Sequence, residues 1–198
     1  MPAGAYTILH EGHVVGREAF RCAPGPAGWR WFSEIETSLP EPHREIVDYT
    51  VDTAWRPVRL RVDTGSHRIE LTSDQGRLRG RRDGQPLDLA LPEDLDYLSP
   101  CFNAVTANRL GGSARIRPLY MDPVTIQPRV VDQTYDHLGE EGIDTPVGRF
   151  PATAWRYTAP ATGFTARLWV AGDIVVSYEG VFELAEYEPG PAGPVPLT

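Results

Sequence analysis

The chain has 198 residues, of which 19 are basic and 27 acidic, and its formal net charge at pH 7 is −8. This acidity disfavours nucleic acid or an anionic membrane as the main partner, and 41% hydrophobic residues are typical of a single globular domain. Two cysteines are too few for a disulfide scaffold, so we expect Cys22 and Cys101 to be buried free thiols, with one bridge between them as the alternative.

Alternating polar and apolar residues predict short strands in the first half of the chain. Segments 6–10 and 14–20 indicate a hairpin around Glu11-Gly12, and Asp83-Gly84 is a strong signal for a second hairpin. Segment 29–39 places Trp29, Trp31 and Ser33 on one face. Further strand-like segments follow at 47–51, 58–62, 69–71 and 87–91.

One segment, residues 100–110, has the features of a helix. Ser99 suits the N-cap, and Pro100 suits the first helical position because its missing N–H has no partner there. Gly111 supplies a left-handed stop after an interior that contains no breaker. A single helix among many strands needs a sheet on which to pack.

The second half of the chain returns to strands, with turns about every eight to twelve residues, which favours an antiparallel meander. We therefore predict a mainly β fold, in which one rolled antiparallel sheet or open barrel wraps around the helix at about residues 100–110. Residues 1–188 are expected to form this single β-roll domain, and 189–198 to be a disordered Pro/Gly tail. The later strand-like segments are 114–120, 124–135, 147–157, 164–171 and 174–186.

The N-terminal segment lacks a basic region followed by an apolar run. No apolar segment approaches the ~18 residues of a membrane-spanning helix. We therefore expect no transmembrane segment and a cytoplasmic location.

Several segments together resemble a family of small bacterial proteins named for glycolipid binding. They include Asp-Leu-Asp at 94–96, Ser-Pro-Cys-Phe-Asn at 99–103 and Asn-Arg-Leu at 108–110, with further matches in 124–135 and 164–182. The resemblance covers roughly 45–187, and it departs from the family where Tyr-Glu-Gly at 178–180 replaces Tyr-Pro-Gly. It implies a rolled, spiral sheet around a helix, similar to the fold of periplasmic lipoprotein carriers, and a lipid or glycolipid ligand. It supplies no catalytic residue.

A concave sheet can leave a cavity lined by aromatic rings, which pack well on sugar faces and acyl chains, although filling the core is their usual role. Polar groups on a helix inside such a sheet face a pocket or satisfy buried backbone groups. From these arguments the expected ligand-binding residues are Trp29, Trp31, Asn103, Arg109, Tyr135 and Tyr178. We expect no catalytic residue, metal ligand or cofactor.

Three other residue patterns are weaker indications of a metal site, a catalytic site or an anion-binding site. His10 and His13 flank a tight turn as a metal pair would, but exposed turn residues explain them better because further ligands are missing nearby. Asp94 or Asp96 with His137 or Tyr135 would suit acid–base catalysis if the fold brought them together. A run of arginines suggests either a solvated sheet face or an anion-binding mouth. It comprises Arg59, Arg61, Arg68, Arg77, Arg79, Arg81 and Arg82.

The sequence therefore favours a non-catalytic binding protein for a lipid, a glycolipid or another amphipathic small molecule, held in the concave face of the sheet. One alternative is an enzyme that acts on a lipophilic small molecule through Asp94 or Asp96 with His137 or Tyr135. The other is a protein-interaction module that uses a sheet face. The oligomeric state stays open.

Overall fold

The computed structural model describes residues 1–190 and 196, and its main body is a 14-stranded sheet. Neighbouring strands in this sheet are antiparallel, and pairing of β1 with β17 joins the two halves of the chain. The sheet starts at β10 and ends at β8, so it is rolled but not closed. The predicted antiparallel roll is thereby confirmed. The tail predicted for 189–198 falls mainly on 191–195 and 197–198, outside the described residues.

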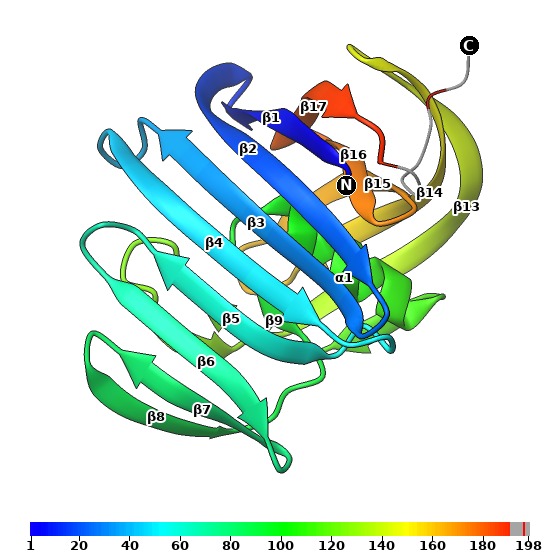
Figure 1. Cartoon of the computed structure of the whole chain (residues 1–198). Coiled ribbons are helices and arrows are strands. Elements are labelled where there is room, and N and C mark those ends of the chain that lie inside the picture. The colour runs from blue at the N-terminus through cyan, green and yellow to red at the C-terminus, as the bar shows by residue number, and fades with distance from the viewer. Residues whose placement is uncertain (191–195, 197–198) are drawn as a thin grey trace.

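The strands of this sheet fall into two consecutive groups along the chain (Figure 1). The first group is β1 (Ala3–His10), β2 (His13–Gly25), β3 (Gly28–Thr37), β4 (His43–Val51), β5 (Pro57–Asp63), β6 (Arg68–Asp74), β7 (Arg77–Arg82) and β8 (Gln85–Ala90). The second group is β10 (Ala114–Ile116), β13 (Gln133–Thr145), β14 (Gly148–Ala159), β15 (Phe164–Ala171), β16 (Ile174–Tyr178) and β17 (Phe182–Glu188). A small second sheet contains β9 (Leu95–Asp96), β11 (Leu119–Met121) and β12 (Pro128–Val130).

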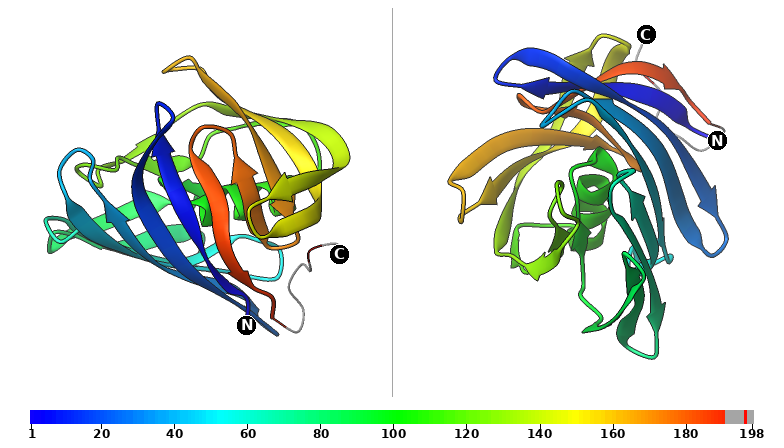
Figure 2. Two further views of the ribbon diagram at one scale, coloured as in Figure 1. Left: turned by 90° about the horizontal axis from the view of Figure 1, so that it is seen from above. Right: turned by 90° about the vertical axis from the view of Figure 1, so that its left-hand side faces the viewer.

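The helix α1 (Pro100–Leu110) lies inside the curled sheet, as Figure 2 shows from two directions. Its first eight residues are all buried, which is the expected state of a helix enclosed on every side. Phe102 stacks on Tyr49 of β4, with ring centroids 4.7 Å apart, and so joins the helix to the sheet. The predicted bounds and the left-handed stop at Gly111 (φ 62°) are confirmed.

Two strand-like segments that the sequence pattern treats as continuous are interrupted by turns, and a third, 114–120, is divided between β10 in the large sheet and β11 in the small sheet. Within 124–135, the carboxylate of Asp122 accepts hydrogen bonds from the backbone N–H groups of Val124 and Thr125, and this turn precedes β12 and β13. Within 174–186, Gly180 has a φ of 71° and separates β16 from β17. Both interruptions come from local turn chemistry that overrides strand propensity.

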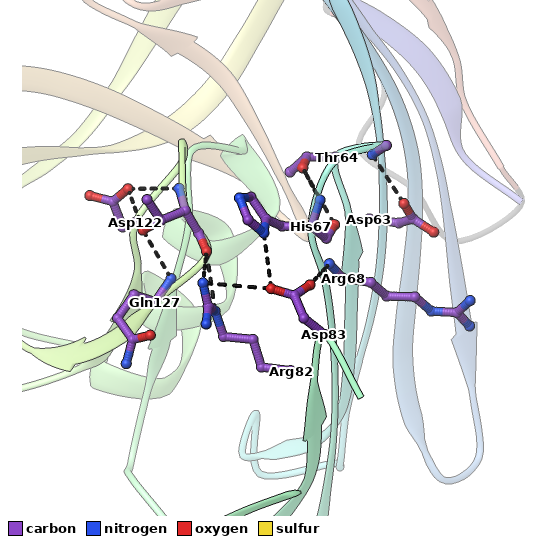
Figure 3. Close-up of polar contacts among 10 residues, drawn as sticks. Asp63, Thr64, His67, Arg68, Arg82, Asp83, Asp122 and Gln127 are labelled. Carbon is purple, nitrogen blue, oxygen red and sulfur yellow. Dashed lines mark hydrogen bonds and ion pairs between the residues drawn. The ribbon is translucent and has the colours of Figure 1, made fainter. Parts of the chain in front are cut away.

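The far end of the rolled sheet is fastened to the small sheet (Figure 3). Asp83, in the β7–β8 turn, accepts hydrogen bonds from His67 Nδ1 at 2.9 Å and from the backbone N–H of Arg68 at 2.8 Å. Arg82 donates to the carbonyl oxygen of Thr125 at 2.7 Å, in the loop before β12. These bonds hold the β7–β8 hairpin over the small sheet.

Among the described residues, no helix has the length and apolar character needed to cross a bilayer.

Candidate functional site

The space between the helix and the sheet is filled by side chains. Trp31, Tyr49 and Phe102 are each at most 2% exposed, and they meet in the middle of the roll. A cavity bordered by Trp31 measures about 10 Å³, which is room for one water molecule. An acyl chain or a sugar does not fit in this cavity.

The predicted ligand-binding residues lie in or beside this packed interior. Asn103 donates from Nδ2 to the hydroxyl of Tyr135 at 2.8 Å, so these two buried polar groups satisfy each other. Tyr178 is also buried, and Trp29 is half-buried against Trp55, with ring centroids 4.0 Å apart. Their contacts in the structure are with protein groups. Binding of a ligand by these residues stays a prediction.

Arg109, the sixth of the predicted residues, forms a paired interaction with Asp94. Its Nε lies 2.7 Å from Asp94 Oδ1, and its Nη2 lies 2.5 Å from Oδ2. Asp94 is only 2% exposed, and Thr106 Oγ1 donates to it at 3.2 Å. The pair therefore anchors the last turn of α1 to the segment that leads into β9.

The residues suggested for acid–base catalysis each have a different interaction partner. Asp94 is paired with Arg109, and Asp96 accepts a hydrogen bond from Gln133 Nε2 at 2.5 Å. Burial raises the pKa of Asp96 to about 6, against the lowering effect of the Gln133 bond. His137 is exposed and packs edge-to-face on Trp155, with ring centroids 5.0 Å apart. Asp94, Asp96 and Tyr135 are each hydrogen-bonded to another side chain, and the catalytic interpretation stays a prediction.

The two histidines suggested as a metal pair flank the turn between β1 and β2. His10 and His13 are cross-strand neighbours, as expected, and both are exposed. Within residues 1–190 and 196, no group of three or more His, Cys, Asp or Glu side chains is arranged to hold a metal ion.

The arginine run, except Arg82, lies on the outer side of β5, β6 and β7, and most of its members form ion pairs. Arg61, Arg77 and Arg79 contact Asp63, Asp88 and Asp74 at 3.2, 2.7 and 2.6 Å. Arg68 pairs with Glu70, and Arg82 is bound to the Thr125 carbonyl described above. The arginines of the run other than Arg82 therefore form a solvated outer face, whereas Arg82 shares the inner face of β7 with the buried Leu78.

A groove of about 580 Å³ lies at one rim of the roll. We call it the rim groove, and its walls are residues 14, 16 and 17 of β2, 36–38 at the end of β3 and 42–44 at the start of β4. Gly16, Thr37 and His43 are cross-strand neighbours and form the outermost row of the concave face. A Cβ at Gly16 would lie 2.3 Å from the carbonyl oxygen of Glu36, so glycine is needed for the close approach of β2 to β3.

The rim groove combines ion pairs with exposed apolar side chains. Arg17 lies 2.8 Å from Glu186, and Arg44 lies 2.8 Å from Glu36; all four side chains are mostly exposed. Val14, in the groove wall, is 70% exposed. Exposed ion pairs are weak and exchange partners readily, so they can turn toward a charged ligand beside an apolar wall.

His43 lines the groove, and both of its ring nitrogens face oxygen atoms. Its Nδ1 faces the carbonyl oxygen of Glu41 at 2.7 Å, and its Nε2 faces Glu45 Oε1 at 2.7 Å. A carbonyl oxygen and a carboxylate both accept hydrogen bonds, so this geometry favours the imidazole with both nitrogens protonated. Burial lowers the pKa of His43, but the bonds to Glu41 and Glu45 outweigh it and raise that pKa above its usual value.

A second row of the concave face lies directly behind the rim. Glu18, Ile35 and Glu45 are cross-strand neighbours there, and both carboxyl groups are buried. Tyr97 donates to Glu45 Oε2 at 2.5 Å, and Ser99 donates to Glu18 Oε1 at 2.6 Å. The expected N-cap hydroxyl of Ser99 therefore binds the sheet, and it makes no capping bond to the helix.

Sequence reasoning missed this row, although a signal was present. His43 and Glu45 are two residues apart on a strand, so their side chains share a face. Glu18 and Glu45 occupy inward positions, where the alternating pattern elsewhere places apolar residues. A carboxyl group at such a position requires a partner inside the molecule.

Comparison with known proteins supports the fold. A DUF1089 family protein from Pseudomonas aeruginosa superposes with a TM-score of 0.65 at 22% identity, covering 88% of this chain and 95% of that one. A β-barrel-like protein of the domain of unknown function DUF1849, from Brucella abortus, superposes with a TM-score of 0.51 at 10% identity, covering 94% and 96%. No family model and no curated protein matches the sequence. This chain therefore has a β-barrel-like fold, as the sequence resemblance implied.

Proposed function

We propose that this protein is a non-catalytic binding protein for an amphipathic small molecule, such as a lipid or glycolipid, taken up at the rim groove. The observation that carries the proposal is the contrast in size between two spaces. The rim groove is shallow and open to solvent and offers about 580 Å³, whereas the cavity behind Trp31 has about 10 Å³. The ligand therefore binds where the concave face opens at its rim.

The groove suits a molecule with a polar and an apolar part. The polar part is expected to contact His43, which lies on the concave face and donates directional hydrogen bonds to phosphate, carboxylate or hydroxyl oxygens. Arg17 and Arg44 are each one residue away from the concave row and line the outer side of the same rim. The apolar part is expected to lie on Val14, whose side chain is 70% exposed. Covering an exposed apolar side chain with a ligand's hydrocarbon is favourable because both lose contact with water.

Substitution of Val14 tests the proposal with little risk to the fold. Binding of a fluorescent acyl probe, an undecanoic acid with a dansyl group, is measured by titration for the wild type and for Val14→Asp. The matched control is Val130→Asp, since Val130 is 54% exposed on β12, in the small sheet away from the rim.

We expect Val14→Asp to weaken probe binding about tenfold or more, because covering a valine contributes roughly 1.5–3 kcal/mol. Val130→Asp should bind like the wild type. Equal affinities of Val14→Asp and the wild type would contradict the assignment to the rim groove. Absence of probe binding, together with no lipid extracted from the protein purified from its host, would contradict the binding function itself.

A further inference from the structure

The rim groove opens at one end of the roll, which we call the mouth. Because neighbouring strands are antiparallel, the β1–β2, β3–β4, β5–β6 and β7–β8 turns all lie at this end. The backbone N–H of Leu9 donates to the carbonyl oxygen of Val181 at 2.8 Å, so the β16–β17 turn lies there too. The right-hand view of Figure 2 looks onto the mouth. Both halves of the large sheet therefore border it.

Exposed apolar side chains are concentrated around the mouth. Nine large hydrophobic side chains are exposed among the described residues, and four of them lie in or beside turns of the mouth, namely Val14, Leu39, Val124 and Phe164. Val124 is in the turn that Arg82 binds through the carbonyl oxygen of Thr125, next to the β7–β8 turn. Phe164 begins β15 at the end that pairs with Tyr178, the last residue of β16.

The distribution of these side chains along the roll is uneven. A fifth exposed residue, Leu98, lies between Tyr97 and Ser99, whose hydroxyl groups bind the second row of the concave face directly behind the rim. The opposite end of the roll carries two of the nine, Met1 and Val58. Apolar side chains gathered at one end of a molecule mark an interaction site.

We propose that the mouth docks on the surface of a zwitterionic lipid bilayer, and that the rim groove takes its ligand from there. This inference rests on the proposed function, because a lipid or glycolipid resides in a bilayer and meets a protein at its surface. Docking through the mouth brings Val14 and His43, in the groove wall, next to the headgroups. The net charge of −8 opposes a strongly anionic surface, so a bilayer without net charge is the better partner.

The arrangement of the apolar side chains favours a bilayer over a protein partner. Val14, Leu39, Val124 and Phe164 come from four separate turns, whereas a protein interface is built on one closely packed apolar core. A fluid bilayer interface takes up separate side chains one by one. Phe164 also packs against Tyr157 and Tyr178, with ring centroids 6.0 and 6.2 Å away. Tyrosine rings are typical of the depth at which headgroups meet hydrocarbon.

Co-sedimentation of the full chain with sucrose-loaded phosphatidylcholine vesicles tests the docking. We expect the pelleted fraction of the protein to rise with lipid concentration, and the protein to stay in the supernatant without vesicles. Adding phosphatidylserine to the vesicles should lower the pelleted fraction at low ionic strength, because the chain and the surface then repel each other.

Val124→Asp separates docking from ligand binding, because Val124 borders the mouth but is not part of the rim groove wall. We expect it to weaken partition onto the vesicles about tenfold or more, and to bind the dansyl probe in solution like the wild type. Phe164→Ser should weaken partition in the same direction, and it keeps the experiment informative if Val124→Asp fails to fold. Val130→Asp, at an exposed valine on β12, is the matched control and should partition like the wild type.

Equal partition of Val124→Asp and Val130→Asp would overturn the docking, as would a wild type that binds the probe but does not pellet with vesicles; either result leaves the proposed function intact. A wild type that pellets with vesicles but neither binds the probe nor carries lipid would support the docking surface and contradict the proposed function. A dimer in analytical ultracentrifugation that Val124→Asp dissociates would show that a second copy covers the mouth, and would also overturn the proposal.

Discussion

Replacing Arg109 by methionine tests the ion pair that anchors the last turn of α1. The Asp94 carboxylate, 2% exposed, would keep only the bond from Thr106 Oγ1 at 3.2 Å. Breaking a buried pair by removing one partner leaves an uncompensated charge and costs about 3–5 kcal/mol. Because a domain has only about 5–15 kcal/mol of stability, this is a large fraction, and Tm should fall by roughly 6–20 °C.

Urea denaturation followed by tryptophan fluorescence measures the loss in free energy of unfolding. Arg17→Met is the matched control, because the Arg17–Glu186 pair is exposed and such pairs contribute no more than about 1 kcal/mol. Adding Asp94→Asn to Arg109→Met should recover part of the stability, since the amide removes the buried charge. Similar losses for Arg109→Met and Arg17→Met, or no recovery in the double variant, would refute the reasoning.

Two further outcomes follow from the interior of the sheet. Burial raises the pKa of Glu18 from 4.5 to about 7, so its contribution to stability is fully present below about pH 4.5 and is lost as the pH rises to about 7. Relative to the wild type, Glu18→Gln should therefore gain about 3 kcal/mol of unfolding free energy between about pH 4 and pH 8. A difference that does not depend on pH would contradict this. Gly80→Ala places a Cβ 1.8 Å from the carbonyl oxygen of Glu70 and should lower the free energy of unfolding by about 1–3 kcal/mol. In Gly112→Ala the added Cβ has no atom within 4 Å, so the free energy of unfolding should not change. Equal losses of the two alanine variants in urea denaturation would contradict the role of the contact between β7 and β6.

The helix and the inward faces of the strands could be predicted from the sequence because their signals are local. Pro100 and Gly111 mark the two ends of α1, and alternation places Trp31 and Ser33 on one face of β3. Pairing of β1 with β17 has no local signal, since it joins strands from the two ends of the described chain. The same applies to the rim groove, whose walls come from three strands brought together by register.

The candidate ligand residues illustrate the same limit. Their residue types were suited to a pocket, but whether Asn103 faces a ligand or Tyr135 depends on how tightly the sheet curls. In the structure the sheet curls tightly enough for Asn103 Nδ2 to donate a hydrogen bond to the hydroxyl of Tyr135 at 2.8 Å. Sequence patterning gives the face on which a side chain lies, and long-range packing decides what it meets there.

The segment in which the sequence resemblance is concentrated serves mainly to fill and fix the interior of the roll. Carboxyl groups of the sheet hold it at two points, through Glu45 with Tyr97 and Glu18 with Ser99, and the Asp94–Arg109 pair ties its two ends to each other. Glu45 also binds His43, so the anchor of the helix and the wall of the rim groove share one carboxylate. Because the roll is filled by these groups, accessible space remains where the rows of the concave face reach the rim. Polar residues at inward strand positions are therefore a better guide to this site than the helix itself.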